Sequence, residues 1–297
     1  MSGSKTAQRP KLDIDRTREQ LLALGCGHAA DQLGDVLDGA VAKEIAPHVF
    51  LDQLLDIELA GREERRIRTA LRLSNLPSGQ TLENFDFAFQ PAIERSRIET
   101  LATGAWVRGN ETVLLQGPPG VGKTHLAVSL GVKTVQLGFS VQYYRFDELM
   151  TALRADAGLP PSRLKRRKYM STALLIIDEL GFEAMCREEA SLFFRLVTYR
   201  YGRGAILITT NKSVRDWTEL LAGDEVLAAA ILDRLGNYPR AFETYAAANH
   251  LNARSAQARR VDREAYPRLI ERLLAVRQRL IEADLGEGIA TDSWPAR

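Results

Sequence analysis

The amino-acid sequence predicts an α/β fold in which helices flank a parallel sheet. Three apolar runs support this prediction, because each has the character of a buried strand: residues 113–115, 173–177 and 205–208. Stretches with apolar residues at helical spacing separate the runs, so successive strands return to the sheet in the same direction. We expect a small helical domain before this sheet and one further helix after it.

Composition and length limit the class of protein. The 297 residues suffice for one α/β domain and a smaller unit, and 45% hydrophobic with 26% charged residues are typical of a soluble globular chain. No apolar run approaches the roughly 20 residues that cross a bilayer, and the N-terminus lacks the apolar core of a secretory signal. We therefore expect a cytoplasmic protein without a membrane partner.

The cysteines and the charge balance exclude other kinds of site. Cys26 and Cys186 are the two cysteines of the chain, and neither lies in a CxxC pair or beside a histidine cluster, so the sequence indicates neither a disulfide framework nor a zinc site. The formal net charge of +2 means that any nucleic-acid surface has to come from local basic patches.

The first 80 residues read as a helical domain. Apolar residues at helical spacing, interrupted by Gly25 and Gly27, predict two short helices. A longer helix begins near Phe50 and becomes basic in its second half. One face of that half is either a solvated stripe that suits a helix C-terminus or a surface that contacts DNA or a partner. The arginines on this face are Arg62, Arg65, Arg66 and Arg72.

A glycine-rich stretch marks the strongest candidate site. Residues 117–124 read G-P-P-G-V-G-K-T and lie between a predicted strand and a predicted helix. The glycines let the backbone curl with its N–H groups inward, and the helix aims the positive end of its dipole at the same point. Lys123 adds a charge for the β- and γ-phosphates, and the Thr124 hydroxyl is suited to ligate Mg²⁺. The predicted nucleotide-binding residues are Gly117, Pro118, Pro119, Gly120, Val121, Gly122, Lys123, Thr124 and His125.

Two acids end the second apolar run. Asp178 and Glu179 are therefore expected at the carboxyl edge of a buried parallel strand, near the phosphate loop. We expect Asp178 to hold the Mg²⁺ shell together with Thr124, and Glu179 to orient or deprotonate an attacking water. Asn211 follows the third apolar run, either as a sensor that contacts the γ-phosphate or the water, or as an ordinary strand-end cap.

Two segments between these motifs leave alternatives open. The aromatic connector at 81–87 precedes a predicted helix at 92–103, and Phe85 or Phe87 packs either on an adenine ring or in the core. The densest basic cluster, at 163–168, is either solvated surface or a DNA contact.

Further elements complete the predicted α/β domain. A strand at 140–146 and helices at 147–156 and 187–201 continue the alternation. A helix at 224–235 places Arg234 in the middle of its apolar stripe. This arginine either passes the core to reach a carboxylate or reaches the γ-phosphate on a neighbouring subunit, as an arginine finger.

The last residues predict a strand at 240–245 and a helix at 268–284, which docks either on the core or on another chain. From these signals we divide the chain into an N-terminal helical domain at 1–80, the α/β domain at 81–255 and a C-terminal helical extension at 256–297.

The order of the motifs resembles a known family. G-P-P-G-V-G-K-T-H-L-A, L-L-I-I-D-E-L-G, I-T-T-N-K and D-E-V-L-A-A-A-I-L-D-R-L are similar to motifs of AAA+ ATPases of the IstB type. These are helper proteins encoded beside the transposase in a family of bacterial insertion sequences. The resemblance covers residues 12–245 and includes the L-D-x-x-L-D-x-E-L-A-x-R-x-x-R-R segment at 51–66. More distantly, the chain is similar to helicase loaders of the DnaC type.

The resemblance implies an AAA+ P-loop fold and a Mg²⁺-dependent ATPase that converts ATP to ADP and phosphate. It further implies a homo-oligomer with ATP bridged between protomers, sequence-nonspecific binding to duplex DNA, and assistance to a DDE transposase encoded by the adjacent gene. The chain departs from the family at 246–254, where Arg254 is the candidate for a second sensor arginine. The residues that match the family's ATP-binding and catalytic positions are Lys123, Thr124, Asp178, Glu179, Asn211 and Arg234.

Two other functions remain as alternatives. A helicase loader predicts a preference for single-stranded DNA, and the scarcity of aromatic residues in the basic patches disfavours base stacking. A small-molecule P-loop kinase has to exclude an activated water, so the pair Asp178 and Glu179 and the sensor-like Asn211 disfavour that function.

Overall fold

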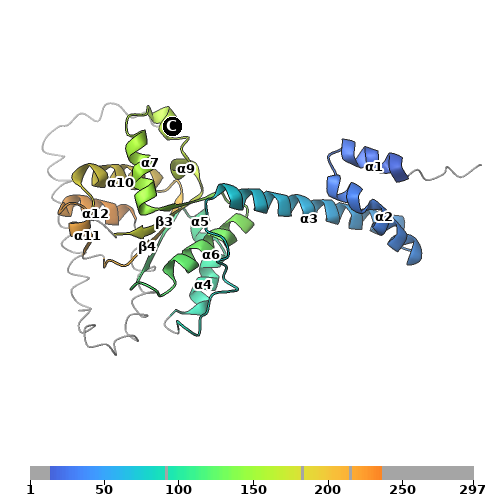
Figure 1. Cartoon of the computed structure of the whole chain (residues 1–297), viewed down its shortest axis with the longest axis horizontal. Helices are drawn as coiled ribbons and strands as arrows, with labels where there is room; N and C mark the ends of the chain where they lie inside the picture. Colours follow the sequence, from blue (N-terminus) through green and yellow to red (C-terminus); the bar gives the residue numbers. More distant parts are fainter. Residues whose placement is uncertain (1–13, 91–92, 182–183, 214–215, 236–297) are drawn as a thin grey trace, which may run out of the picture. The chain divides into compact units, whose positions relative to one another are not determined.

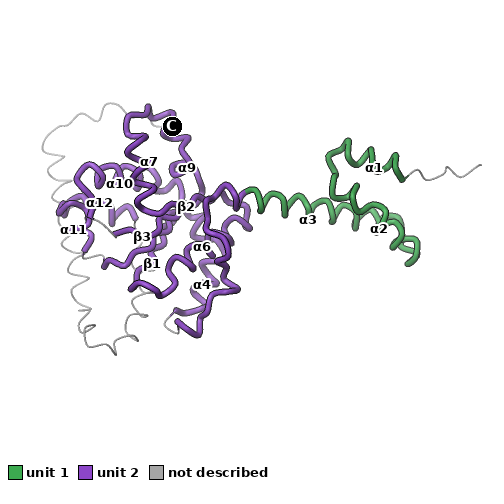
Figure 2. Tube along the Cα trace, viewed as in Figure 1, with its two compact units in different colours: residues 1–69 green, residues 70–297 purple. Residues whose placement is uncertain are grey.

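The computed structural model describes residues 14–90, 93–181, 184–213 and 216–235 (Figure 1). The predicted strand at 240–245, the predicted helix at 268–284 and Arg254 lie outside these residues. The chain forms two compact units, Met1–Thr69 and Ala70–Arg297 (Figure 2). The three-part division at 80 and 255 stays a prediction.

The first unit consists of helices, as the sequence predicts. They are α1 (Ile14–Ala23), α2 (Gly27–Ala42) and α3 (Pro47–Leu73), whose last residues belong to the second unit. Its small core holds Ala29, Leu33 and Leu54, with Leu21, Cys26 and Phe50 packed against them.

A buried carboxylate joins α2 to α3. Glu58, which is 5% exposed, accepts a hydrogen bond from the Ala29 N–H at 3.0 Å and one from Arg62 Nε at 2.7 Å. The carboxylate thus lies at the positive end of α2, where the helix dipole favours it. A Cβ at Gly61 would lie 2.3 Å from the His28 ring, so the helices approach too closely there for any larger residue.

Three arginines in the basic half of α3 are paired with acids of the same helix. Arg62, Arg66 and Arg68 form ion pairs with glutamates three or four residues away. The two exposed pairs, Arg66 with Glu63 and Arg68 with Glu64, are worth only about 0.3–0.5 kcal/mol each. They place a carboxylate beside each of these guanidinium groups, whereas Arg65 and Arg72 form no ion pair within the described residues. Both alternatives for the predicted face therefore stay open.

The second unit contains the predicted parallel sheet. Its strands are β1 (Thr112–Gln116), β2 (Val141–Arg145), β3 (Leu174–Leu180) and β4 (Ala205–Thr210), in the order β1-β4-β3-β2. All neighbouring pairs are parallel. The order places β3 and β4 in the centre, so the carboxyl ends of the two most apolar strands lie side by side, beside the end of β1.

Helices cover both faces of this sheet (Figure 1). On one face, Ile176 of β3 lies against α6 (Lys123–Gln136), since a Cβ at Gly131 would lie 2.8 Å from its Cδ1. On the other face, Leu175 and Ile177 join a core built mainly from α7 (Phe146–Asp156), α10 (Arg187–Arg200) and α12 (Glu225–Arg234). The α/β fold with a preceding helical segment is therefore confirmed.

The remaining helices are short. α4 (Arg95–Ala102) matches the predicted helix at 92–103. The sequence did not predict four helices of four residues each, because one turn is too short to show a periodic pattern. These are α5 (Ala105–Arg108), α8 (Pro161–Leu164), α9 (Lys168–Ser171) and α11 (Trp217–Leu220). Within the described ranges, no helix is long and apolar enough to cross a membrane.

A buried arginine closes the amino edge of the sheet. Arg200, at the end of α10, is 1% exposed, and burial lowers its pKa to about 10. Its two terminal nitrogens donate to backbone carbonyls, so the guanidinium joins the segment before β3 to the start of β4. The accepting oxygens belong to Tyr169, Met170, Thr172, Ala173 and Ala205.

Candidate nucleotide-binding site

The glycine-rich stretch connects β1 to α6, as predicted. Gly117 N–H donates to Thr210 O at 3.1 Å, which holds the start of the loop against the end of β4. Gly120 and Gly122 have φ of 81° and 88°, in the left-handed region that glycine adopts without strain. Gly122 is also the N-cap of α6, so the loop turns directly into the positive end of that helix dipole.

The first two residues of α6 supply polar side chains beside the loop. Lys123 Nζ donates to Pro118 O at 2.8 Å, so its ammonium group lies over the loop. Burial lowers the pKa of Lys123, against the opposing effect of nearby Asp178 and Glu179. Thr124 Oγ1 lies 3.0 Å from both carboxylate oxygens of Asp178. The first turn of α6 contains no acidic residue, so its positive end is available to an anion.

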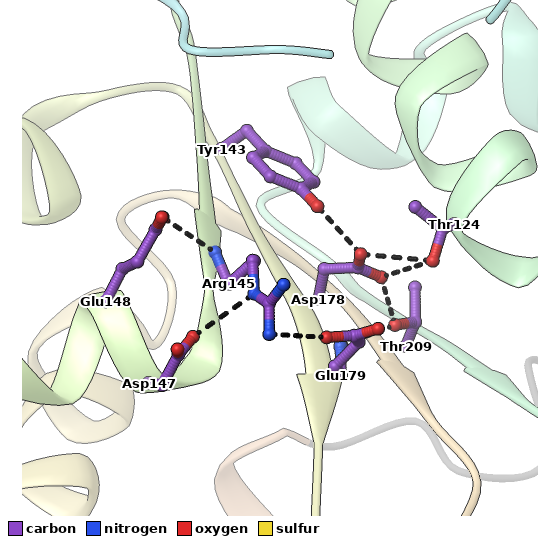
Figure 3. Close-up of polar contacts among 8 residues, drawn as sticks. All are labelled: Thr124, Tyr143, Arg145, Asp147, Glu148, Asp178, Glu179 and Thr209. Carbon is purple, nitrogen blue, oxygen red and sulfur yellow. Dashed lines mark hydrogen bonds and ion pairs between the residues drawn. The ribbon is translucent and has the colours of Figure 1, made fainter. Parts of the chain in front are cut away.

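Asp178 accepts hydrogen bonds from three hydroxyl groups (Figure 3). The residue is 2% exposed, and besides Thr124 its carboxylate accepts hydrogen bonds from Tyr143 at 2.7 Å and from Thr209. Burial raises the pKa of the Tyr143 hydroxyl, and the hydrogen bond to Asp178 raises it further. All three donors are therefore uncharged. In the described part of the chain, no ion pair involves Asp178.

This arrangement fits a divalent cation. A buried carboxylate whose hydrogen-bond partners are neutral gains most from a nearby positive charge. Asp178 and Thr124 bring together the oxygen ligands that Mg²⁺ prefers, next to a loop shaped for phosphate groups. The metal-binding residues predicted from the sequence thus lie within hydrogen-bond distance of each other.

A β-bulge sets the direction of Glu179. The register between β3 and β4 shifts between Ile177 and Leu180, so Asp178 and Glu179 together lie opposite Thr209. Glu179 has φ of 62°, and its N–H donates to Thr209 Oγ1 at 2.9 Å. The side chain of Glu179 is 42% exposed although its strand neighbours are buried. The bulge therefore lets one buried and one accessible carboxylate follow each other in the chain.

Arg145, at the end of β2, holds the accessible acid. Its Nη2 lies 3.2 Å from the Glu179 carboxylate, and its Nε lies 3.4 Å from Asp147 (Figure 3). The sequence patterns did not predict a role for Arg145, Tyr143 or Thr209. The available signal was their position near the ends of strands, which becomes informative only once the strand order is known.

Comparison with known proteins decides the family. The family model described as IstB-like ATP binding protein matches residues 19–257. The chain belongs to this family. The resemblance to ATP-binding proteins of the IstB type is therefore confirmed.

Relatives in insertion sequences support this assignment. One, from Pseudomonas aeruginosa, is named as an ATP-binding protein of insertion sequence IS21 and is 45% identical over 210 residues, 70% of this chain and 78% of the relative. Another, from Geobacillus stearothermophilus, is named as an ATP-binding protein of IS5376 and is 35% identical over 206 residues, 69% of this chain and 82% of the relative.

Solved structures give weaker similarity. The crystal structure of the DnaC helicase loader is 24% identical with a TM-score of 0.42, covering 55% of this chain and 91% of that chain. DnaA from Aquifex aeolicus with AMPPCP is 21% identical with a TM-score of 0.42, covering 53% and 49%. The assignment to the IstB-like family rests on the family match and the relatives, not on these superpositions.

Asn211 lies one residue beyond β4 and is exposed. The contacts to the acid-bearing strand come instead from the two residues before it. Thr209 bonds to Asp178 and Glu179, and Thr210 Oγ1 donates to Leu180 O at 2.6 Å. Within the described residues, no hydrogen bond of the Asn211 side chain is recorded. The sensor role in this IstB-like protein stays a prediction.

Arg234 is the last residue of α12 and is partly buried. Its Nη1 donates to Ala230 O at 3.1 Å, and its guanidinium lies 4.8 Å from the centre of the Phe194 ring in α10. Among the residues that the structure describes, it forms no ion pair with a carboxylate. The finger role also stays a prediction for this family member.

The connector lies against the phosphate loop. His125 Nε2 is 2.9 Å from Thr81 O and from Asn84 Oδ1, so this predicted binding residue contacts the connector. The Phe85 ring packs edge-on against His125, and a Cβ at Gly122 would lie 2.7 Å from it. Phe85 packs in turn against Phe87. Phe85 is half-buried and lies beside the phosphate loop, so both alternatives for this ring stay open.

Proposed function

We propose that the chain is a Mg²⁺-dependent ATPase that oligomerises on duplex DNA without reading its sequence and assists a DDE transposase encoded by the adjacent gene. One observation carries the catalytic part: the phosphate loop, the buried Asp178 and the accessible Glu179 meet at the same edge of the sheet. A buried carboxylate for a cation and a second carboxylate for a water are the groups that hydrolysis of a triphosphate requires.

The roles of the side chains follow from their positions. Lys123 and the backbone of the loop bind the β- and γ-phosphates, and Thr124 and Asp178 hold Mg²⁺. Bound Mg²⁺ would neutralise charge on the phosphate oxygens. Glu179 accepts the proton of the attacking water or orients it. Glu179 reaches that water after its exposed ion pair with Arg145 opens, which costs at most about 1 kcal/mol.

The basic cluster at 163–168, between α7 and β3, is favoured as the DNA contact because three of its cations have no acidic partner within the described residues. Arg167 pairs with Asp156, and Lys168 Nζ donates to Leu73 O. The exposed Arg163, Lys165 and Arg166 form no ion pair within the described residues. This contrasts with α3, where three arginines already have glutamate partners.

Replacing these three cations tests the contact. Because each phosphate contact contributes about 0.9 to the slope of log affinity against log salt, the triple alanine variant is expected to lose roughly 2.7 from that slope. Alanine at Arg62, Arg66 and Arg68 serves as the control and is expected to leave the slope nearly unchanged. An equal loss in both variants, measured by fluorescence anisotropy on duplex DNA, would contradict this assignment.

The names of the relatives support the transposition role. Both are named as proteins of insertion sequences, whose movement requires a transposase. ATP between two protomers would stabilise their contact if Arg234 of one reaches the γ-phosphate on the other, so nucleotide state would control oligomer length. Weak DNA contacts of successive protomers would then add along the duplex.

Substitution Glu179→Gln tests the function. This variant is expected to bind ATP with unchanged affinity, to lose hydrolysis by at least about 100-fold, and to form long-lived oligomers on DNA. Glu99→Gln, on α4 and outside the site, is the control and is expected to behave as the wild type. If ATP changes neither the size of the wild-type assembly nor its retention on duplex DNA, the proposal is refuted. Stronger ATP-dependent retention of single strands than of duplex would favour a helicase loader instead.

Substitution Arg234→Ala tests the contact between protomers. The variant is expected to bind ATP normally but to remain small in light scattering with ATP, while Arg203→Ala, another partly stacked surface arginine, assembles normally. Normal assembly of the Arg234 variant would remove the finger assignment.

A further inference from the structure

Tyr143 faces the same side of the sheet as Asp178. In the parallel register of β2 and β3, Tyr143 lies opposite Ile176, and Arg145 lies opposite Asp178. Side chains two residues apart in a strand share a face, so Tyr143 is the diagonal neighbour of Asp178 on the face covered by α6. The next residue, Tyr144, points to the opposite face and packs edge-on against Tyr169.

The hydroxyl of Tyr143 has a defined partner. It donates to Asp178 Oδ2 at 2.7 Å, and the residue is 8% exposed. Hydrogen bonds to ionised acceptors are shorter and stronger than those between neutral groups.

The two strands that flank β3 fix the carboxylate from both sides. Thr209, from β4, donates to Oδ1, and Tyr143, from β2, donates to Oδ2. The remaining direction faces Thr124, the other predicted metal ligand. Both carboxylate oxygens are therefore oriented before any cation binds, and both also lie 3.0 Å from Thr124 Oγ1.

The backbone of Tyr143 is itself held in place. Its N–H donates to the carbonyl of Ser74 at 2.8 Å, and the side chain of Gln142 lies 3.3 Å from the same oxygen. Ser74 is fully buried at the end of α3. β2 is therefore hydrogen-bonded on both sides at this point, to β3 within the sheet and to Ser74 at its outer edge.

We propose that Tyr143 is a positioning residue for the cation site: its hydroxyl orients Asp178 so that Asp178 and Thr124 bind Mg²⁺ together. This inference rests on the proposed Mg²⁺-dependent hydrolysis of ATP. Partners that hydrogen-bond to metal ligands typically change metal affinity by about 10- to 100-fold when they are removed. Tyr143 acts through Asp178 and contacts neither the nucleotide phosphates nor the water in this scheme.

Substitution Tyr143→Phe removes only the hydroxyl, and Tyr144→Phe makes the same change on the other face of the same strand. Mn²⁺ binding to the full chain with ADP, followed by electron paramagnetic resonance, is expected to weaken about 10-fold or more for Tyr143→Phe and less than about twofold for Tyr144→Phe. The Mg²⁺ concentration for half-maximal hydrolysis is expected to rise by the same factor. Binding of a fluorescent ADP in EDTA is expected to stay unchanged in both variants.

The outcomes separate this inference from the proposed function. Equal Mn²⁺ affinities of the two phenylalanine variants would overturn the role of Tyr143. In an Asp178→Asn background, Tyr143→Phe is expected to cause no further loss of Mn²⁺ affinity, and a full additional loss would also overturn it. A wild-type protein that binds Mn²⁺ with ADP but hydrolyses no ATP would refute the proposed ATPase, and the Mn²⁺ comparison would still decide the role of Tyr143.

Discussion

Each of the two edges of the sheet buries a charged side chain, and the hydrogen-bond partners of the two side chains differ. Asp178 at the carboxyl edge is 2% exposed and is bonded by side-chain hydroxyls from three separate elements. Arg200 at the amino edge is 1% exposed and is bonded by five backbone carbonyls. Burial of a charge therefore does not identify a functional site by itself. Asp178 and Arg200 differ in the kind of hydrogen-bond partner. Arg200 is bonded by backbone carbonyls, which hold elements of the fold together, whereas Asp178 is bonded by neutral hydroxyls and can still bind a cation.

Positive φ values occur at both edges of the sheet, since Asn110 and Gly202 precede the amino ends of β1 and β4. Near the carboxyl edge, Gly120, Gly122, Glu179 and Gly181 all have positive φ. A left-handed conformation costs a residue other than glycine about 1 kcal/mol, and such residues cluster where a site requires them. At the amino edge, a Cβ on Gly204 would lie 2.6 Å from Arg200 Nη2, so glycine there makes room for the guanidinium. At the carboxyl edge, the positive φ values shape the phosphate loop and orient Glu179. At the amino edge, the absence of a side chain at Gly204 leaves room for Arg200.

The largest expected effect is at the amino edge. Arg200→Met would leave several buried carbonyls without donors, so we expect the free energy of unfolding to fall by at least about 3 kcal/mol in urea denaturation. Arg203→Met, which removes an exposed arginine stacked on Tyr199, is expected to cost less than about 0.5 kcal/mol. Equal losses would show that the carbonyl contacts of Arg200 contribute little.

The second-largest effect is expected from alanine substitutions of the glycines at the two ends of α6. Gly122 and Gly138 have φ of 88° and 92°, but a Cβ meets the Phe85 ring at 2.7 Å only in the case of Gly122 and meets nothing within 4 Å at Gly138. Each alanine variant is expected to lose about 1 kcal/mol of stability from backbone strain. Gly122→Ala is expected to lose more, together with its affinity for a fluorescent ATP analogue. Retention of that affinity would contradict the role of this glycine in the loop.

The sequence predicted those features that depend on local patterns. The glycine-rich loop, the apolar runs and their terminal acids are contiguous in the chain, so residue type and spacing reveal them. The partners of Asp178 come from positions 31 to 54 residues away, and their contact depends on the strand register. Arg200 likewise reads as an ordinary basic residue near a helix end. Four-residue helices and the bulge at Glu179 lack any periodic signal.

The smallest expected effect lies away from both edges. The Lys133 ammonium holds the pKa of exposed Glu83 at about 2. Because this folded-state pKa lies below the ordinary value of 4.5, the stabilisation is present above pH 4.5 and is lost as the pH falls toward 2. Glu83→Gln should make unfolding by acid slightly less steep in that interval. Lys133→Gln should have the same effect, and an unchanged acid transition in both would contradict the pair.

The bond from Tyr143 N–H to Ser74 O has a consequence for solubility. β2 is the last strand of the sheet, and an unprotected last strand offers its N–H groups to any extended chain. Ser74 occupies this donor from within the same polypeptide. A foreign strand therefore cannot pair with β2 at this N–H, which removes one site of edge-to-edge aggregation.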